Sequence, residues 1–175
     1  MRRHNGAVFV DSHCHLTFPE LRNRIDAIRA DMAAARVDRA LVICTTLEEF
    51  ADVHALALRH DNFWASAGVH PDNEDVEEPT VQRLTALASL PKVVGIGETG
   101  LDYYRLGDRT IEQMEWQRER FRAHIRAARE CGKPRGGRGV RRAQRCGAPL
   151  AERGVCLRLG HAGRLPTLHG PPGPS

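Results

Sequence analysis

Val93-Val94-Gly95-Ile96-Gly97-Glu98-Thr99-Gly100-Leu101-Asp102 is the stretch that decides the fold. Its first half is a short apolar run, which is typical of a strand buried on both faces of a parallel sheet. Its second half places one carboxylate, that of Glu98, on a glycine-flanked turn directly after this run. An isolated ionised carboxylate is very costly to bury. The stretch therefore predicts a strand whose carboxyl end delivers Glu98 into a polar site.

Three similar apolar runs precede this strand, and helical periodicity lies between them. The expected strands cover residues 7–11, 40–44, 63–69 and 93–97. The expected helices cover residues 19–35, 47–60, 80–89 and 110–132. Capping boxes of the S/T-x-x-E/Q type begin the second and fourth helices at Thr46 and Thr110. The alternating order predicts a parallel sheet with right-handed crossovers, whose loops after the strands form one functional face.

The composition changes abruptly after Pro134. Of the 41 residues from 135 to 175, 22 are Gly, Arg or Pro, so the segment has little apolar surface to bury. A closed eight-stranded α/β barrel takes about 250 residues, and this chain has 175. We therefore expect residues 1–134 to form the first half of a TIM-type (β/α)8 barrel, with about four βα units. Residues 135–175 are expected to be a disordered, low-complexity basic tail, or the product of a GC-rich gene translated out of frame.

Charge and cysteine content narrow the function classes. The net charge of +4 comes from residues 135–175, which carry eight arginines and one glutamate, so a basic surface on the folded part is not expected. The five cysteines form no C-x-x-C motif, which argues against a disulfide framework and favours a reduced, cytoplasmic setting. No apolar run approaches the length of a signal sequence or membrane span. Membrane partners and other protein partners are not expected.

Two histidines follow the first predicted strand. Alternate side chains of an extended strand share a face, so His13 and His15 project together while Cys14 points the other way. Two neutral imidazoles on one face can bind the same divalent ion. The H-x-H pattern alone is a weak signal, but its place at the end of a buried strand favours a metal site. Asp11 either fixes the tautomer of one imidazole as a partner behind the metal ligands, or caps a helix or turn.

The remaining candidates lie on the same predicted loop face. Glu98 either pairs with a Lys or Arg, or bridges two divalent ions, which need an anionic ligand between them. His70 closes the third strand and is either a site residue or a loop histidine set by the following proline. After Glu98 come Asp102, Tyr103, Tyr104 and Arg105, of which Arg105 can pair with a phosphate. Ordinary packing or a surface salt bridge is the competing interpretation for these four residues.

Four motifs in order resemble the TatD family of metal-dependent deoxyribonucleases, over about residues 7–134. They are Ser12-His13-Cys14-His15-Leu16, Gly68-Val69-His70-Pro71, Gly97-Glu98-Thr99-Gly100-Leu101-Asp102-Tyr103-Tyr104 and Gln117-Arg118-Glu119-Arg120-Phe121. The resemblance implies a metallo-dependent hydrolase barrel, two divalent ions (Mg, Mn or Zn) and hydrolysis of phosphodiester bonds in DNA. It also implies that His13 and His15 bind one metal and that Glu98, the catalytic residue, bridges both.

The resemblance ends where the composition changes. The family's other metal ligands are a histidine in an apolar-His-x-Arg stretch of the fifth strand, a histidine on the next strand and a late aspartate. The fifth strand should follow Pro134, where the sequence is Arg135-Gly136-Gly137-Arg138-Gly139. His161 and His169 are weak counterparts, and residues 135–175 contain no aspartate. We therefore expect a truncated protein with weak metal binding and impaired turnover.

Two other classes of function remain open from the sequence. One is a different metallo-dependent hydrolase of the same fold, acting on a small ester, lactone or amide. The other is a non-catalytic fragment whose basic tail binds nucleic acid. A test of metal binding separates the non-catalytic fragment from an enzyme. A comparison of substrates separates a hydrolase of small esters, lactones or amides from a nuclease.

Overall fold

One parallel sheet organises the part of the chain that the structure, a computed structural model, describes. This part comprises residues 8–104, 106 and 108–138, with the backbone alone for residues 135–138. The strands lie in the order in which they occur along the chain, and every neighbouring pair is parallel. They are β1 (Phe9–Cys14), β2 (Val37–Val42), β3 (Phe63–Ala67), β4 (Val93–Gly100) and β5 (Arg135–Arg138).

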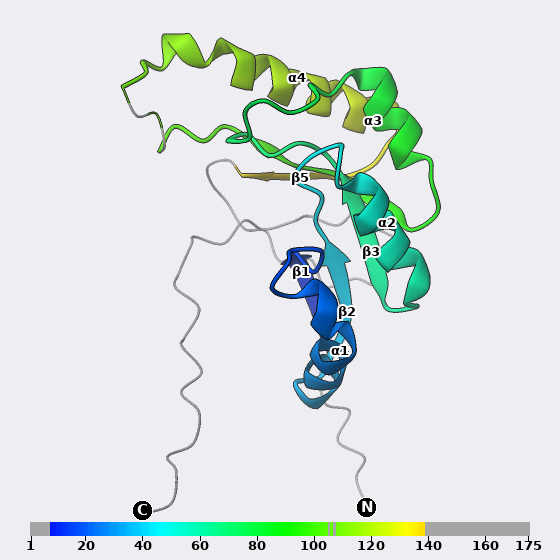
Figure 1. The fold of residues 1–175 in the computed structure, drawn as a ribbon. Coiled ribbons are helices and arrows are strands. Elements are labelled where there is room, and N and C mark those ends of the chain that lie inside the picture. The colour runs from blue at the N-terminus through cyan, green and yellow to red at the C-terminus, as the bar shows by residue number, and fades with distance from the viewer. Residues whose placement is uncertain (1–7, 105, 107, 139–175) are drawn as a thin grey trace, which may run out of the picture.

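Helices connect the strands, as parallel crossovers require. They are α1 (Ile25–Ala34), preceded by the short helix η1 (Arg22–Arg24); α2 (Phe50–Arg59); α3 (Val81–Ala88); and α4 (Glu115–Glu130), preceded by η2 (Glu112–Met114). Figure 1 shows the helices arranged in chain order around the outside of the curved sheet. α2 packs on β3, and α3 and α4 pack on β4 and on each other. This arrangement confirms the predicted α/β class and the first part of a TIM-type barrel.

Side-chain hydrogen bonds cap the start of α3 and lie in the turns that precede α2 and η2. The Glu49 backbone N–H donates to Thr46 Oγ1 over 3.2 Å, while the Glu49 carboxylate accepts from the Thr45 N–H rather than from that of Thr46. Thr80 Oγ1 accepts from the Arg83 N–H over 3.1 Å at the start of α3. Before η2, the Thr110 N–H donates to Gln113 Oε1 over 2.7 Å. These bonds satisfy donors that a helix N-terminus otherwise leaves unpaired.

The hydrophobic core lies between the sheet and helices α2 to α4. Val42, Phe63 and Ile96 on the strands are fully or almost fully buried, as are Val53 of α2 and Leu84 of α3. α1 has no buried residue and packs on this core with partly buried side chains. Burial is therefore greatest around β2, β3 and β4, the strands at the centre of the sheet.

The structure corrects three sequence expectations. The β1 side chains Phe9 and Val10 are 54% and 45% exposed, because β1 is an edge of the described sheet, so this strand is not buried on both faces. β2 begins at Val37, three residues before the predicted run. Residues 135–138, assigned to the tail from their composition, form β5, whose backbone pairs with β4. Backbone pairing needs no apolar side chain, so composition gave no signal for it.

The rest of the predicted tail, residues 139–175, lies outside the described residues. Among the helices that the structure does describe, none is both long enough and apolar enough to cross a membrane.

Candidate metal centre

The carboxyl ends of three strands bring four predicted residues together. His13 lies near the end of β1, and His15 follows it; His70 follows β3, and Glu98 lies in β4. The Nε2 atoms of His13 and His15 are 3.1 Å apart, and they lie 3.4 and 3.7 Å from Glu98 Oε2. His70 Nε2 lies 3.8 Å from the other carboxylate oxygen, Oε1. The two oxygens of Glu98 therefore face different histidines.

The donor atoms of His13, His15 and Glu98 fit a divalent ion. All three lie within 4.8 Å of one another. Two ligand atoms that each sit about 2.1 Å from one ion are at most about 4.2 Å apart, and the three measured separations meet this limit. Imidazole nitrogens and a carboxylate oxygen are ligands that Zn²⁺ and other transition metals accept. The side chains that the sequence predicted as ligands are thus arranged as ligands would be.

Electrostatics favour the neutral, metal-binding form of His15. Burial lowers the pKa of this imidazole, and the neighbouring His13 lowers it further, whereas Glu98 acts in the opposite direction. Glu98 itself is only 2% exposed, in keeping with a carboxylate enclosed by polar partners. A neutral imidazole presents a lone pair, which protonation would remove.

The two nearby cysteines are not part of this constellation. The Cys14 thiol donates to the Leu41 carbonyl, and the Cys44 thiol donates to the Thr46 carbonyl. Burial is the main cause that raises the pKa of both thiols, that of Cys44 to about 12. A thiol must lose its proton to bind a metal. Cys44 is buried and Cys14 is partly buried, so both pack as small side chains with protonated thiols.

A close approach of two glycines positions Glu98. A Cβ atom on Gly68 would lie 2.4 to 2.7 Å from backbone atoms of Gly97, closer than real Cβ atoms ever come. The loop after β3 therefore passes directly against the residue before Glu98. The Glu98 N–H also donates to the Cys44 carbonyl over 2.9 Å. Absence of a side chain at residue 68 is what lets the His70 loop reach the glutamate.

The other candidates have less direct roles. Asp11 Oδ1 accepts from the His13 backbone N–H over 3.0 Å, so of its two predicted roles the structure supports the turn cap. The Asp102 N–H donates to Gln117 Oε1, and Asp102 Oδ1 accepts from the Tyr104 N–H. The Tyr103 hydroxyl accepts from Arg118 Nη1. Arg105 lies outside the described residues, so its predicted pairing with a phosphate stays a prediction.

Three supporting residues on α4 were not predicted from the sequence: Gln117, Arg120 and His124. All are buried, with exposures of 0%, 3% and 0%, although they are polar. Arg120 hydrogen-bonds the carbonyl of His70, and His124 accepts from the N–H of Val69. The motif Gln117-Arg118-Glu119-Arg120-Phe121 held two of them, but helical periodicity cannot show that a polar residue faces inward to a loop.

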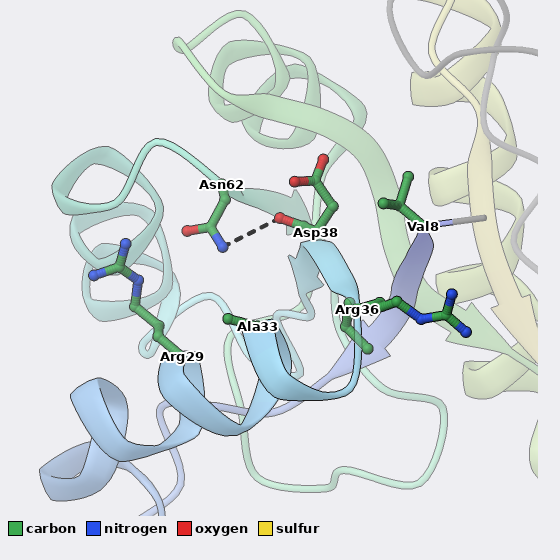
Figure 2. A pocket seen from close by; sticks show the side chains of 7 residues that line it. Val8, Arg29, Ala33, Arg36, Asp38 and Asn62 are labelled. Atoms are coloured by element: carbon green, nitrogen blue, oxygen red, sulfur yellow. Dashed lines mark hydrogen bonds between the residues drawn. The ribbon is translucent and has the colours of Figure 1, made fainter. Parts of the chain in front are cut away.

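A cavity of about 420 Å³ lies at the opposite end of the strands. Its lining includes Val8 before β1, Val37 and Asp38 at the start of β2, and Asn62 before β3. Figure 2 shows Asn62 bonded to the Asp38 carbonyl, over 3.2 Å, with the guanidinium groups of Arg29 and Arg36 well apart. Active sites of such barrels lie at the carboxyl ends of the strands, so we assign no catalytic role to this cavity.

Comparison with known proteins identifies the family. The sequence profile described as "TatD related DNase" matches residues 10–135. The chain belongs to the TatD family. It is 40% identical over 128 residues to a protein named "Uncharacterized metal-dependent hydrolase YcfH" in Escherichia coli strain K12. It is 38% identical over 125 residues to "3'-5' ssDNA/RNA exonuclease TatD" of Enterobacter lignolyticus.

A solved TatD structure also resembles this one. The crystal structure of the TatD homologue YJJV from Escherichia coli K12 superposes with a TM-score of 0.62 at 32% sequence identity. The match covers 73% of this chain and 49% of the homologue. The alignments with YcfH and with the TatD exonuclease each cover 71% of this chain and 46% of the relative. The chain thus spans about half the length of these TatD relatives.

Proposed function

We propose that this chain is built for metal-dependent hydrolysis of phosphodiester bonds in DNA. The observation that carries the proposal is the cluster of His13, His15 and Glu98, whose donor atoms are spaced as ligands of a divalent ion. Family membership supports hydrolysis, and nuclease-named relatives support a nucleic-acid substrate. When bound, divalent ions supply hydroxide near neutral pH and counter the charge that develops on the phosphate.

Three histidines surround the Glu98 carboxylate and face different oxygens of it. His13 and His15 present their Nε2 atoms beside Oε2, on the β1 side of the carboxylate. Oε1 faces His70, on the side where β3 ends. In a two-metal site, Glu98 would be the residue that holds both ions, with His13 and His15 holding one of them. Which of Mg²⁺, Mn²⁺ or Zn²⁺ the chain prefers is part of the test.

The test is a nuclease assay on the full chain and two variants. Purified protein is incubated with end-labelled single-stranded DNA and with Mg²⁺, Mn²⁺ or Zn²⁺, and the products are resolved by size. Because the sequence predicts impaired turnover, we expect slow metal-dependent cleavage that falls by more than about 100-fold in Glu98→Gln. Asp31→Asn, which changes an exposed carboxylate on α1, should cleave like the wild type.

Three results would count against the proposal. Equal rates in the wild type and Glu98→Gln would mean that any cleavage comes from a contaminant. Absence of cleavage with every metal would favour a non-catalytic role for the chain. Faster turnover of a small ester or lactone than of DNA would favour a different hydrolase activity of the same metal site.

A further inference from the structure

Hydrogen bonds hold His70 on three sides. Its backbone N–H donates to the Thr45 carbonyl over 2.8 Å, and its own carbonyl accepts from Arg120 Nη1 over 2.8 Å. Its ring Nδ1 accepts from the backbone N–H of Asp72 over 3.1 Å. The side chain is 13% exposed. Both the backbone and the ring orientation of His70 are therefore fixed before any ligand arrives.

The bond from Asp72 also fixes the tautomer of His70. A ring nitrogen that accepts a hydrogen bond carries no proton, so a neutral His70 carries its proton on Nε2. This Nε2 is the atom that lies 3.8 Å from Glu98 Oε1. A protonated nitrogen has no lone pair for a metal. The geometry makes His70 a hydrogen-bond donor beside the metal centre, in contrast to the ligand arrangement of His13 and His15.

Two buried side chains of helix α4, Arg120 and His124, hydrogen-bond the loop that carries His70. Arg120 Nη1 also donates to the Asn73 carbonyl over 2.6 Å, and Arg120 Nε donates to Glu78 Oε2 over 3.0 Å. His124 Nε2 accepts from the Val69 N–H over 3.0 Å, and its Nδ1 lies 2.7 Å from the Arg120 carbonyl. A buried guanidinium is retained only where several acceptors satisfy it. Here two of those acceptors are backbone carbonyls of the loop that carries His70.

We propose that His70 donates a hydrogen bond from Nε2 to an oxygen of the substrate's phosphate group, and that Arg120 and His124 are its positioning residues. The proposal rests on the proposed phosphodiester hydrolysis. A fixed donor aimed at the place where negative charge develops stabilises the transition state without reorganisation. A neutral donor also stays close to bound cations without repelling them, which a charged imidazolium would not.

The first test measures the tautomer and needs no activity. The full chain is labelled with ¹⁵N-histidine, and ring signals are assigned by the loss of one signal in each of His13→Gln, His15→Gln and His70→Gln. We expect His70 to carry its proton on Nε2 and to keep it when Zn²⁺ is added, while the signals of His13 and His15 shift. A proton on Nδ1, or loss of the Nε2 proton with Zn²⁺, would overturn the donor role.

The second test uses thymidine 5'-monophosphate as a phosphate probe in the presence of Zn²⁺. We expect the His70 Nε2–H signal to shift on titration with the probe, and His70→Ala to weaken probe binding by about tenfold. His70→Gln, whose amide can still donate, should recover part of this loss. Zn²⁺ affinity, measured by calorimetry, should stay within about twofold in both variants. An unmoved His70 signal contradicts the proposal even if DNA is cleaved.

Activity then separates this proposal from the one on which it rests. If the wild type cleaves DNA, His70→Ala should lower kcat by about 100-fold, as expected when one transition-state donor is removed. If the wild type does not cleave, the proposed function fails, whereas the tautomer and the probe titration still decide the role of His70.

The positioning role is tested on α4 with matched variants. In Arg120→Lys, which loses the planar fork, the His70 ring signal should broaden and probe binding should weaken by about tenfold. Arg122→Gln changes an exposed arginine of the same helix, and Val53→Ala lowers stability away from the loop; both should leave the His70 signal sharp. Glu78→Gln, at a 59% exposed side chain, provides a milder change if Arg120→Lys does not fold. An unchanged His70 signal in Arg120→Lys, or in Glu78→Gln when that variant replaces it, would overturn the role.

Discussion

At the scale of single residues, the site depends on which protonation state each histidine holds. Burial is the main cause that lowers the pKa of both His15 and His124. His124 reaches about 4, and its ring accepts from Val69 N–H on one side, which only a neutral imidazole can do. The neutral state therefore suits His15 as a ligand and His124 as an acceptor.

His124 should make the stability of the protein depend on pH. Its pKa is near 6.5 in an unfolded chain and about 4 in the fold, so the unfolded state binds more protons between these values. The free energy of unfolding should therefore be lost as pH falls from about 6.5 to about 4, by up to about 3 kcal/mol. Urea unfolding of the wild type and His124→Gln across this range measures it.

The comparison between these two proteins isolates His124, because the other titrating groups are common to both. His124→Gln should be the less stable protein near pH 7 and should show the flatter pH profile. Parallel profiles would contradict the assigned neutral state of His124.

At the scale of elements, the loop after β3 and strand β4 approach each other closely at Gly68 and Gly97. Gly68 faces the Gly97 backbone with no room for a Cβ atom, whereas a Cβ on Gly95 of β4 would only reach ordinary contact, 3.5 Å from the Pro134 carbonyl. Gly68 thus has no room for a Cβ atom, whereas Gly95 does. This difference allows a paired substitution.

Gly68→Ala should destabilise the protein by about 1 to 3 kcal/mol, the usual range for overpacking, because backbone must move to make room. Displacement of Gly97 should also carry Glu98 away from His13 and His15, so that metal affinity falls. Urea unfolding and calorimetric titration with Zn²⁺ measure the two effects.

Gly95→Ala is the control for this prediction, since its Cβ meets no close contact. It should change the free energy of unfolding by less than about 1 kcal/mol and leave Zn²⁺ affinity unchanged. Similar effects of the two substitutions would show that the approach of Gly68 to Gly97 is not what positions Glu98.

At the scale of the whole molecule, the described chain is a five-stranded parallel sheet with a candidate metal site at its carboxyl ends. Residues from β1, β4 and the loop after β3 meet there, so the site exists only when the sheet is assembled. Ligand binding that requires the fold must stabilise it. We therefore predict that metal binding and folding are coupled in this protein.

Added Zn²⁺ or Mn²⁺ should raise the thermal unfolding temperature of the full chain. At a free metal concentration 100 times Kd, the stabilisation is about 2.7 kcal/mol. Glu98→Gln should lose most of this gain, because the carboxylate faces both His13 and His15. Differential scanning calorimetry with and without metal measures it.

Glu115→Gln, which changes an exposed carboxylate on α4, should keep the full metal-dependent gain. A gain of equal size in Glu98→Gln would place the stabilising metal elsewhere on the molecule.

The local sequence was sufficient for most of the elements. Apolar runs of strand length and helical periodicity identified β2, β3, β4 and the four helices, because burial against a sheet imposes both patterns. Strand β5 was missed because backbone pairing with β4 gives no signal in the composition of Arg135–Arg138. The exposure of Phe9 and Val10 was missed because an edge strand and a central strand can have the same apolar composition.

By itself, the sequence determined the α/β class, the family and the candidate ligands His13, His15 and Glu98. Strand alternation and the position of a polar residue after an apolar run are local properties, so they are visible in the chain. Only the tertiary structure decided that His70 faces the second oxygen of Glu98, and that Arg120 and His124 hold its loop. These contacts join residues that are 28 positions apart (His70 and Glu98), 50 apart (His70 and Arg120) and 55 apart (Val69 and His124), and no local pattern encodes them.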